Sequence, residues 1–284
     1  MRPGAATAEA ISVSYTAPWG RSSGRGRSRR ARRHPIPAAA ARTLAEESII
    51  DDHPHTGADR IPPGQYVTQK WPILTYGETP RIAPASWQLR VTGLVAAERA
   101  FGWEQFQALP RRRVTADFHC VTRFSTLDNA WEGVAPAELL RQAGVGPEAA
   151  HVLVHCYGGY TTNLPLEDLL SERAVLADTH NGAPLPVDHG GPVRLVVPHL
   201  YAWKSAKWVN GLELLREDHR GFWERNGYHV YGDPWREERF SSQETREAYQ
   251  VRRRAQQLGL SPDDPGDPPA TALAATRPRP ATGG

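Results

Sequence analysis

Lysine is scarce in this chain of 284 residues: only Lys70, Lys204 and Lys207 occur among its 34 Lys and Arg residues. Cysteine is scarcer still, because Cys120 and Cys156 are the only two, and two thiols are too few for a disulfide framework. No apolar run approaches the roughly 20 residues that a membrane-spanning helix needs. These shortages exclude a disulfide-stapled scaffold and favour a reducing compartment.

The formal charge of +3 and the isoelectric point near 9.0 are due to one part of the chain. The excess of arginine lies between residues 21 and 33, and elsewhere acidic and basic residues are interspersed, so we expect no specific nucleic-acid partner. Arg29 and Arg30 are not followed by a sustained apolar core of the kind an export signal has. We therefore predict a cytoplasmic protein with no membrane partner.

Composition divides the chain into three parts. Residues 1–58 are rich in Ala, Arg, Gly, Ser and Pro without periodicity, which predicts a disordered basic segment. Residues 59–245 contain the periodic apolar patterns of a globular domain. Residues 246–284 are expected to form a C-terminal helix and a disordered, Pro-rich tail.

Periodicity within the central part indicates short strands mixed with short helices. Alternating patterns predict strands at 87–91, 114–118 and 151–155, with a turn at 157–160. Proline near the start, or just after the end, of an amphipathic stretch predicts helices at 101–109, 135–143 and 165–170. Strands and helices do not alternate regularly, so the expected class is α+β with mixed sheets.

One segment combines an apolar strand with two of the three lysines. The run Leu195 to Val197 stops at Pro198 and is followed by Lys204 and Lys207, three residues apart. Two ammonium groups so close together suit a bound anion such as a phosphate. The segment 193–208 is therefore a candidate for an anion-binding loop.

Cys120 follows the strand predicted at 114–118, and its local sequence leaves three interpretations open. It can be a small buried side chain, a nucleophile paired with His119 or His155, or a soft ligand to a metal. Zinc is disfavoured because no second cysteine or histidine follows at the spacing of a zinc finger.

Read together, these features resemble the molybdopterin-binding domain of the sulfite oxidase family, in particular its small bacterial members without a haem domain. The shared order is a cysteine at a strand end, a Gly-x-Pro-x-Arg-Leu-x-x-Pro strand at 190–198, and a Lys-x-x-Lys loop that leads into Trp208. The resemblance covers about residues 60 to 245. It implies the sulfite oxidase-type fold and a molybdenum–molybdopterin cofactor.

The resemblance also implies roles for single residues. Cys120 would be the protein thiolate on molybdenum, where a polarizable sulfur suits a redox-active metal. Tyr201 and Arg123 would face the substrate as catalytic residues. The residues implied to hold the pterin and its phosphate are Cys156, His189, Arg194, Lys204, Ser205, Ala206 and Lys207.

The function implied is transfer of an oxygen atom between water and a small substrate through a Mo(VI)/Mo(IV) couple. The substrate is a sulfite-like anion or a sulfoxide-like compound, and the direction stays open. No haem or flavin motif is present, so a separate partner would exchange electrons with the enzyme. Two alternatives are a cysteine hydrolase using Cys120 and a redox-inactive module that binds an anion or nucleic acid.

Overall fold

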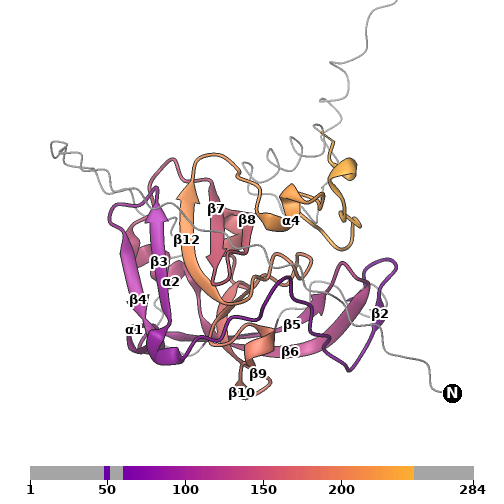
Figure 1. Cartoon of the computed structure of the whole chain (residues 1–284), viewed down its shortest axis with the longest axis horizontal. Coiled ribbons are helices and arrows are strands. Elements are labelled where there is room, and N and C mark those ends of the chain that lie inside the picture. Colours follow the sequence, from indigo (N-terminus) through magenta and orange to yellow (C-terminus); the bar gives the residue numbers. More distant parts are fainter. Residues whose placement is uncertain (1–47, 52–59, 246–284) are drawn as a thin grey trace, which may run out of the picture. The chain divides into compact units, whose positions relative to one another are not determined.

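Two β-sheets form the framework of the protein in a computed structural model, which describes residues 48–51 and 60–245. The described residues up to Ser241 belong to one compact unit, and the following description concerns that unit. In Figure 1 the strands of one sheet stand together, and the longest strands of the other sheet run across beneath them. The mixed sheets and short helices confirm the α+β class predicted from the sequence.

The larger sheet has seven strands in the order β1-β5-β6-β9-β10, with β2 paired to β6 and β11 paired to β9. The β5–β6, β6–β9 and β9–β11 pairs are antiparallel, whereas β1–β5 and β2–β6 are parallel. The bounds are β1 Ser48–Asp51, β2 Tyr66–Val67, β5 Arg111–His119, β6 Phe124–Val134, β9 Val175–His180, β10 Ala183–Pro184 and β11 Arg194–Val196.

The smaller sheet has five strands in the order β4-β3-β12-β7-β8. Its one parallel pair is β3–β12, and the other neighbours are antiparallel. The bounds are β3 Gln88–Gly93, β4 Arg99–Gly102, β7 His151–Cys156, β8 Thr161–Pro165 and β12 Val209–Leu215.

Short helices connect the strands. Pro136 begins α2 and Gly144, with φ 72°, ends it, which is the arrangement that the sequence predicts. The helices are η3 Pro84–Ser86, α1 Trp103–Gln107, α2 Pro136–Ala143, α3 Leu166–Leu170, η4 Val187–His189, α4 Phe222–Arg225 and η5 Ser241–Gln243.

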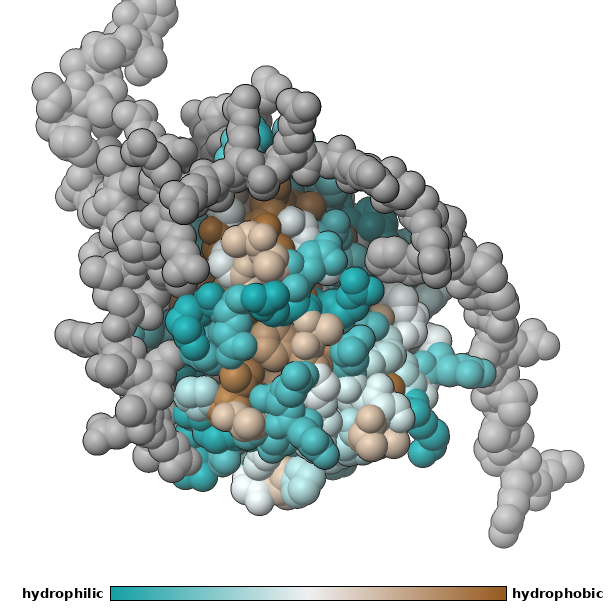
Figure 2. Space-filling view, turned by 90° about the vertical axis from the view of Figure 1, so that its left-hand side faces the viewer, coloured by the Kyte–Doolittle hydropathy of each residue, from teal (hydrophilic) through white to brown (hydrophobic). Residues whose placement is uncertain are grey.

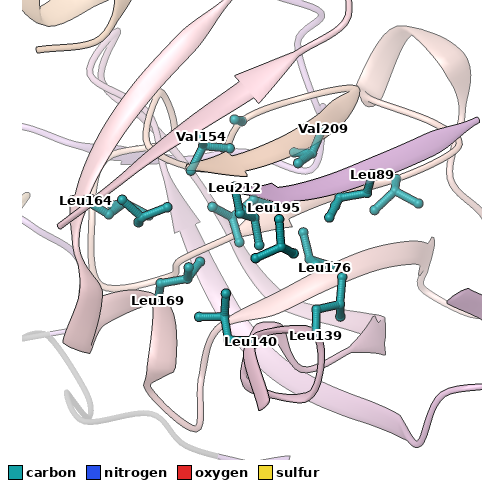
Figure 3. Packing of buried hydrophobic residues seen from close by; sticks show 14 of the residues in the cluster. Leu89, Leu139, Leu140, Val154, Leu164, Leu169, Leu176, Leu195, Val209 and Leu212 are labelled. Carbon is teal, nitrogen blue, oxygen red and sulfur yellow. The ribbon is translucent and has the colours of Figure 1, made fainter. Parts of the chain in front are cut away.

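The main core lies where the two sheets and helices α2 and α3 meet (Figure 3). Leu89 and Leu212 come from the smaller sheet, Leu176 and Leu195 from the larger one, and Leu139 from α2, and all five are fully buried. Strand β7 shows why the sequence folds this way: Val152, Val154 and Cys156 are buried while the residues between them are not. On the side of β4 and α1, hydrophilic residues surround smaller hydrophobic areas (Figure 2).

Three expectations differ from the structure. The helix predicted at 101–109 begins at Trp103, because Phe101 is buried in β4 opposite Leu89 of β3. Strand β6, which the sequence analysis did not predict, spans 11 residues. Residues 48–51 of the segment expected to be disordered form β1, whereas the other residues of 1–58 and all of 246–284 lie outside the described ranges.

Candidate functional site

A pocket of about 520 Å³ opens where loops from both sheets converge, and its volume suits a cofactor or a small ligand. Its walls come from residues 71–76, the end of β5, the glycine pair 158–159, residues 202–203 and 205–208, and the side chains of Phe222, Trp223 and Tyr228. Among the described residues that line it, Arg194 and Lys207 are the only ones with a formal charge at neutral pH, and none is Asp or Glu. The pocket is therefore cationic at one place and otherwise uncharged.

Cys120 lies in this pocket immediately after β5, as the sequence predicts. Its Sγ accepts a hydrogen bond from Thr122 Oγ1 at 3.1 Å. Its backbone is fixed by three contacts: its N–H donates to Phe124 O, and its carbonyl accepts from Arg123 N and from Gln65 Nε2. The sulfur is thus held in a defined position at a turn between two long strands.

The surroundings of Cys120 do not favour a nucleophilic thiolate. Burial raises the pKa of the thiol above its ordinary value, although Thr122 and Arg239 partly oppose that shift. Reactive cysteines instead have a lowered pKa. Nδ1 of His119 lies 2.8 Å from Ser125 Oγ, and Nε2 of His155 lies 2.8 Å from Glu213 Oε2. The hydrolase alternative gains no support from this geometry, whereas a metal ion would favour the thiolate form.

Arg194 is 3% exposed, and its guanidinium donates to backbone oxygens rather than to a carboxylate. Nη1 donates to His189 O at 3.0 Å and Nη2 to Ser205 O at 2.7 Å. No ion pair joins Arg194 to any Asp or Glu in the part of the chain that the structure describes. Burial lowers the pKa of Arg194 to about 9, so the group is still charged at pH 7. A buried cation without a counter-ion marks a place for an anion.

Aromatic rings surround the Arg194 guanidinium. Its Cζ lies 5.0 Å from the ring centre of Phe118, 5.4 Å from Trp131 and 5.7 Å from Trp71. The ring of His189 stacks on Trp71 with centroids 3.7 Å apart. Burial, Arg194 and Lys207 together lower the pKa of His189 to about 4, so its imidazole is neutral at pH 7. The rings provide a flat, uncharged wall beside the cation.

Lys207 adds the second positive charge to this end of the pocket. Its Nζ donates to Leu74 O at 2.8 Å, Thr75 Oγ1 at 2.6 Å and Asp188 O at 2.9 Å, which are all neutral oxygens. Burial, with Arg194 as the next cause, lowers the pKa of Lys207 to about 8. A Cβ on Gly190 would lie 3.0 Å from the Cβ atoms of Arg194 and Lys207, so glycine lets the chain segments that carry the two cations pack closely.

Ser205 and Ala206 also line the pocket, but their backbone N–H groups already have acceptors. Ser205 N donates to Ala202 O and Ala206 N donates to Lys204 O, each at 3.1 Å. The Ser205 hydroxyl accepts from Val197 N at 2.9 Å. Neither N–H group is therefore free to bind a phosphate in this structure, and the role of the two residues in holding the cofactor stays a prediction from the sequence.

Lys204 is not brought to the pocket. Its ammonium is fully buried and pairs with Glu224 Oε1 at 2.6 Å. It also donates to Asn163 O and Oδ1 at 2.9 Å and to Val230 O at 2.7 Å. We therefore correct the expectation that Lys204 holds the cofactor, because its charge is already neutralised inside the protein. The two lysines of one short segment have different roles.

Three other predicted residues also lie outside the pocket lining, as far as the described residues show. Tyr201 is fully buried, lies under the Arg239 guanidinium at 5.0 Å, and has its pKa raised to about 12 by burial. Arg123 is exposed and has φ 79° in the turn after Cys120. Cys156 is buried at the end of β7, and burial raises the pKa of its thiol. The structure thus brings together Cys120, His189, Arg194, Ser205, Ala206 and Lys207.

Some residues of the site were missed from the sequence. Trp71 lies in a stretch without periodicity, and nothing near it indicates that it stacks on His189. Gly158 and Gly159 were assigned only to a turn, yet both line the pocket with φ near 80°. Their adjacency was the available signal, because two successive glycines allow a close approach of backbone to a ligand.

The described residues contain no cluster of three or more His, Cys, Asp or Glu side chains that could hold a metal ion by themselves. A metal next to Cys120 would therefore have most of its ligands supplied by an organic cofactor. A pocket with one thiol and a separate pair of unpaired cations defines the binding site of an anionic, metal-carrying cofactor.

Residues 76–223 match the family described as the oxidoreductase molybdopterin binding domain. The chain belongs to this family, and is an oxidoreductase with a molybdenum–molybdopterin cofactor. The family and the cofactor expected from the sequence are thus confirmed. The sulfite oxidase-type fold is confirmed as well.

Several relatives show how the similarity is distributed. The uncharacterized oxidoreductase YuiH of Bacillus subtilis is 49% identical over 183 residues, which are 64% of this chain and 92% of that protein. The putative protein-methionine-sulfoxide reductase subunit YedZ1 of Azospira oryzae is 28% identical, over 61% of this chain and 66% of that protein. Mitochondrial sulfite oxidase of Drosophila melanogaster is 28% identical, but the match covers only 30% of its length.

No helix in the described ranges is long and apolar enough to cross a membrane.

Replacing Lys204 tests its structural role. Lys204→Met leaves Glu224 fully buried without its cation, and losing one partner of such a pair costs about 3–5 kcal/mol of unfolding free energy. Urea denaturation of the cofactor-free protein measures the change. The exposed Lys70→Met is the matched control, with stability unchanged within about 0.5 kcal/mol. Wild-type stability in Lys204→Met would argue against the role assigned to this pair.

Acid should destabilise the cofactor-free protein through His180 and His189. Burial lowers the pKa of both from 6.5 to about 4, so between these pH values the unfolded chain binds more protons than the folded one. Their contribution to stability is complete above pH 6.5 and is lost as the pH falls towards 4. Glu167 acts in the opposite direction, because burial raises its pKa to about 7.

A double variant separates the histidines from Glu167. Between pH 7 and 4.5 the wild type should lose roughly 1 to 3 kcal/mol more unfolding free energy than His180→Asn combined with His189→Asn. Denaturant titrations at several pH values measure this difference. Parallel pH profiles for both proteins would rule out the two histidines as the cause.

Proposed function

We propose that this protein is an oxygen-atom-transfer oxidoreductase whose molybdenum cofactor is bound between Cys120 and the pair Arg194 and Lys207. The observation that carries the proposal is the charge pattern of the pocket: two partly or fully buried cations without a carboxylate partner share one cavity with a fixed thiol. A terminal phosphate would neutralise the cations, and the thiol is a suitable ligand for a soft metal.

The residues present fit the two ends of such a cofactor. Cys120 would ligate molybdenum, with Thr122 Oγ1 as a hydrogen-bond donor to the sulfur. Lys207 would act as a compact charge for the phosphate, and Arg194 would hold planar or anionic groups through its fork of N–H donors. The stacked pair His189 and Trp71 would pack against the flat part of the pterin.

When bound, the cofactor supplies the Mo(VI)/Mo(IV) couple that exchanges an oxygen atom with a small substrate. The protein contributes position and exclusion of competing groups. No carboxylate in the described lining competes for the metal. Cys120 stays fixed by its backbone contacts, so the metal end keeps one geometry.

Two kinds of relative support oxygen-atom transfer and leave its direction open. One is named a mitochondrial sulfite oxidase and another a protein-methionine-sulfoxide reductase catalytic subunit. We propose a small-molecule substrate and a separate electron-transfer partner for this chain. The cytoplasmic location stays a prediction from the sequence, as do the roles of Tyr201, Arg123 and Cys156.

Metal analysis tests the proposed ligand. Protein purified from a host that makes molybdopterin should contain about one molybdenum per chain, and Cys120→Ala should contain almost none. Ser86→Ala is the control, because this exposed residue does not line the pocket, so its molybdenum content should equal that of the wild type. Equal molybdenum in Cys120→Ala and the wild type would disprove the assignment.

Pterin retention tests the phosphate end. Losing a hydrogen bond to a charged group costs about 1.5–3 kcal/mol, so Lys207→Ala should weaken cofactor binding by about 10- to 150-fold. Oxidised pterin fluorescence after dialysis measures the retained cofactor. Lys70→Ala, which removes the exposed third lysine, should retain as much pterin as the wild type. Full retention by Lys207→Ala would place the phosphate elsewhere.

A further inference from the structure

Thr122 lies two residues after Cys120 and lines the same pocket. Its Oγ1 is 3.1 Å from Cys120 Sγ and donates a hydrogen bond to the sulfur. The structure gives this hydroxyl no second partner among the described residues. Because Thr122 is exposed, packing of the core does not require a hydroxyl at this position. Its contact with the sulfur is therefore the feature that calls for a function.

A tight turn fixes the distance between the hydroxyl and the sulfur. Cys120 N donates to Phe124 O and Arg123 N donates to Cys120 O, each at 2.9 Å, so the chain reverses between β5 and β6 within three residues. Arg123 has φ 79°, the left-handed conformation that closes many three-residue loops. Threonine is branched at Cβ, which restricts its side chain to few rotamers. The local backbone thus places the donor beside the sulfur.

One other group acts on the same sulfur, but from a distance. Burial raises the pKa of the Cys120 thiol, and Thr122 and, to a smaller extent, Arg239 oppose that shift. Arg239 donates to Val121 O and forms an ion pair with Glu237 at 3.7 Å. In the described part of the chain, Thr122 is therefore the only residue whose side chain donates a hydrogen bond to this sulfur.

Hydrogen bonds to a metal-bound sulfur change the redox potential of the metal. A donor draws electron density from the thiolate, so the sulfur gives less charge to the metal and the reduced state gains stability relative to the oxidised one. An ordinary hydrogen bond changes an equilibrium constant about 2- to 10-fold. For a one-electron step this corresponds to about 20 to 60 mV.

We propose that Thr122 is a positioning residue for the metal ligand: its hydroxyl orients the Cys120 sulfur and raises the reduction potential of the molybdenum that this sulfur binds. The inference rests on the proposed function, since it needs molybdenum on Cys120. A higher potential makes the metal a better electron acceptor. Thr122 therefore shifts the balance between the two directions of oxygen-atom transfer towards oxidation of the substrate.

Two variants separate the hydroxyl from the shape of the side chain. Thr122→Val keeps the branched shape without the donor, whereas Thr122→Ser keeps the donor without the methyl group. Redox titration of the holoenzyme, followed by the molybdenum EPR signal, measures the one-electron potentials. They should fall by about 20 to 60 mV in Thr122→Val and stay close to the wild type in Thr122→Ser. Thr92→Val is the matched control and should change neither potential, because Thr92 is half-buried on β3 and does not line the pocket.

The absorption spectrum gives an independent readout at the sulfur. Without the hydrogen bond the sulfur holds its electrons less tightly, so the sulfur-to-molybdenum charge-transfer absorption of oxidised Thr122→Val should move to longer wavelength. That of Thr122→Ser should stay at the wild-type position. EPR and charge-transfer absorption report only on loaded molecules, so partial loss of molybdenum does not hide either result.

Several outcomes would overturn the role of the hydroxyl. These are wild-type potentials or wild-type absorption in Thr122→Val, and equal shifts in Thr122→Val and Thr122→Ser. Complete loss of molybdenum from both variants would also overturn it, because the side chain would then act through its shape. Loss from Thr122→Val alone would support the orienting role. A wild type without molybdenum would instead overturn the proposed function on which the inference rests.

Discussion

The buried guanidinium of Arg194 is the constraint on which the rest of the site depends. A charge at this depth needs compensation, and the described residues supply three backbone carbonyls and three aromatic rings but no carboxylate in an ion pair. Strand β11 begins with Arg194, and Gly190 allows the Lys207 backbone to approach it closely. Burying these two cations without an anion lowers the stability of the fold, and an anionic cofactor would offset that loss when it binds.

The other end of the site depends on the antiparallel pair β5–β6. The turn between these strands positions Cys120 through contacts with Phe124, Arg123 and Gln65. Because β9 joins β6 on one side and β11 on the other, the thiol and the buried cation belong to the same sheet. A single framework therefore fixes both ends of the cofactor, while residues 71–76 and the rings of Phe222, Trp223 and Tyr228 line another part of the pocket.

The sequence predicted which types of residue form the site better than it predicted the contacts that these residues make. Cys120 and Lys207 were predictable because a strand end and a Pro-terminated apolar run are local signals. The different environments of Lys204 and Lys207 were not, since Lys204 is neutralised by Glu224, 20 residues later, and donates hydrogen bonds to Asn163, 41 residues earlier. The role of Trp71 was not predictable for the same reason, because its stacking partner His189 follows more than a hundred residues later. Local sequence patterns predict strands and the types of residue at their ends. Which charged side chains have an ion-pair partner depends on packing between residues far apart in the sequence.

The most direct measurement compares the stabilisation that the cofactor confers on the wild type and on Arg194→Met. Ligand binding to the folded state raises the free energy of unfolding, so loaded and cofactor-free wild type should differ by several kcal/mol. In Arg194→Met this difference should shrink strongly, whatever the stability of the cofactor-free variant. The same difference between loaded and cofactor-free protein in both would contradict the view that Arg194 is buried in order to bind the cofactor.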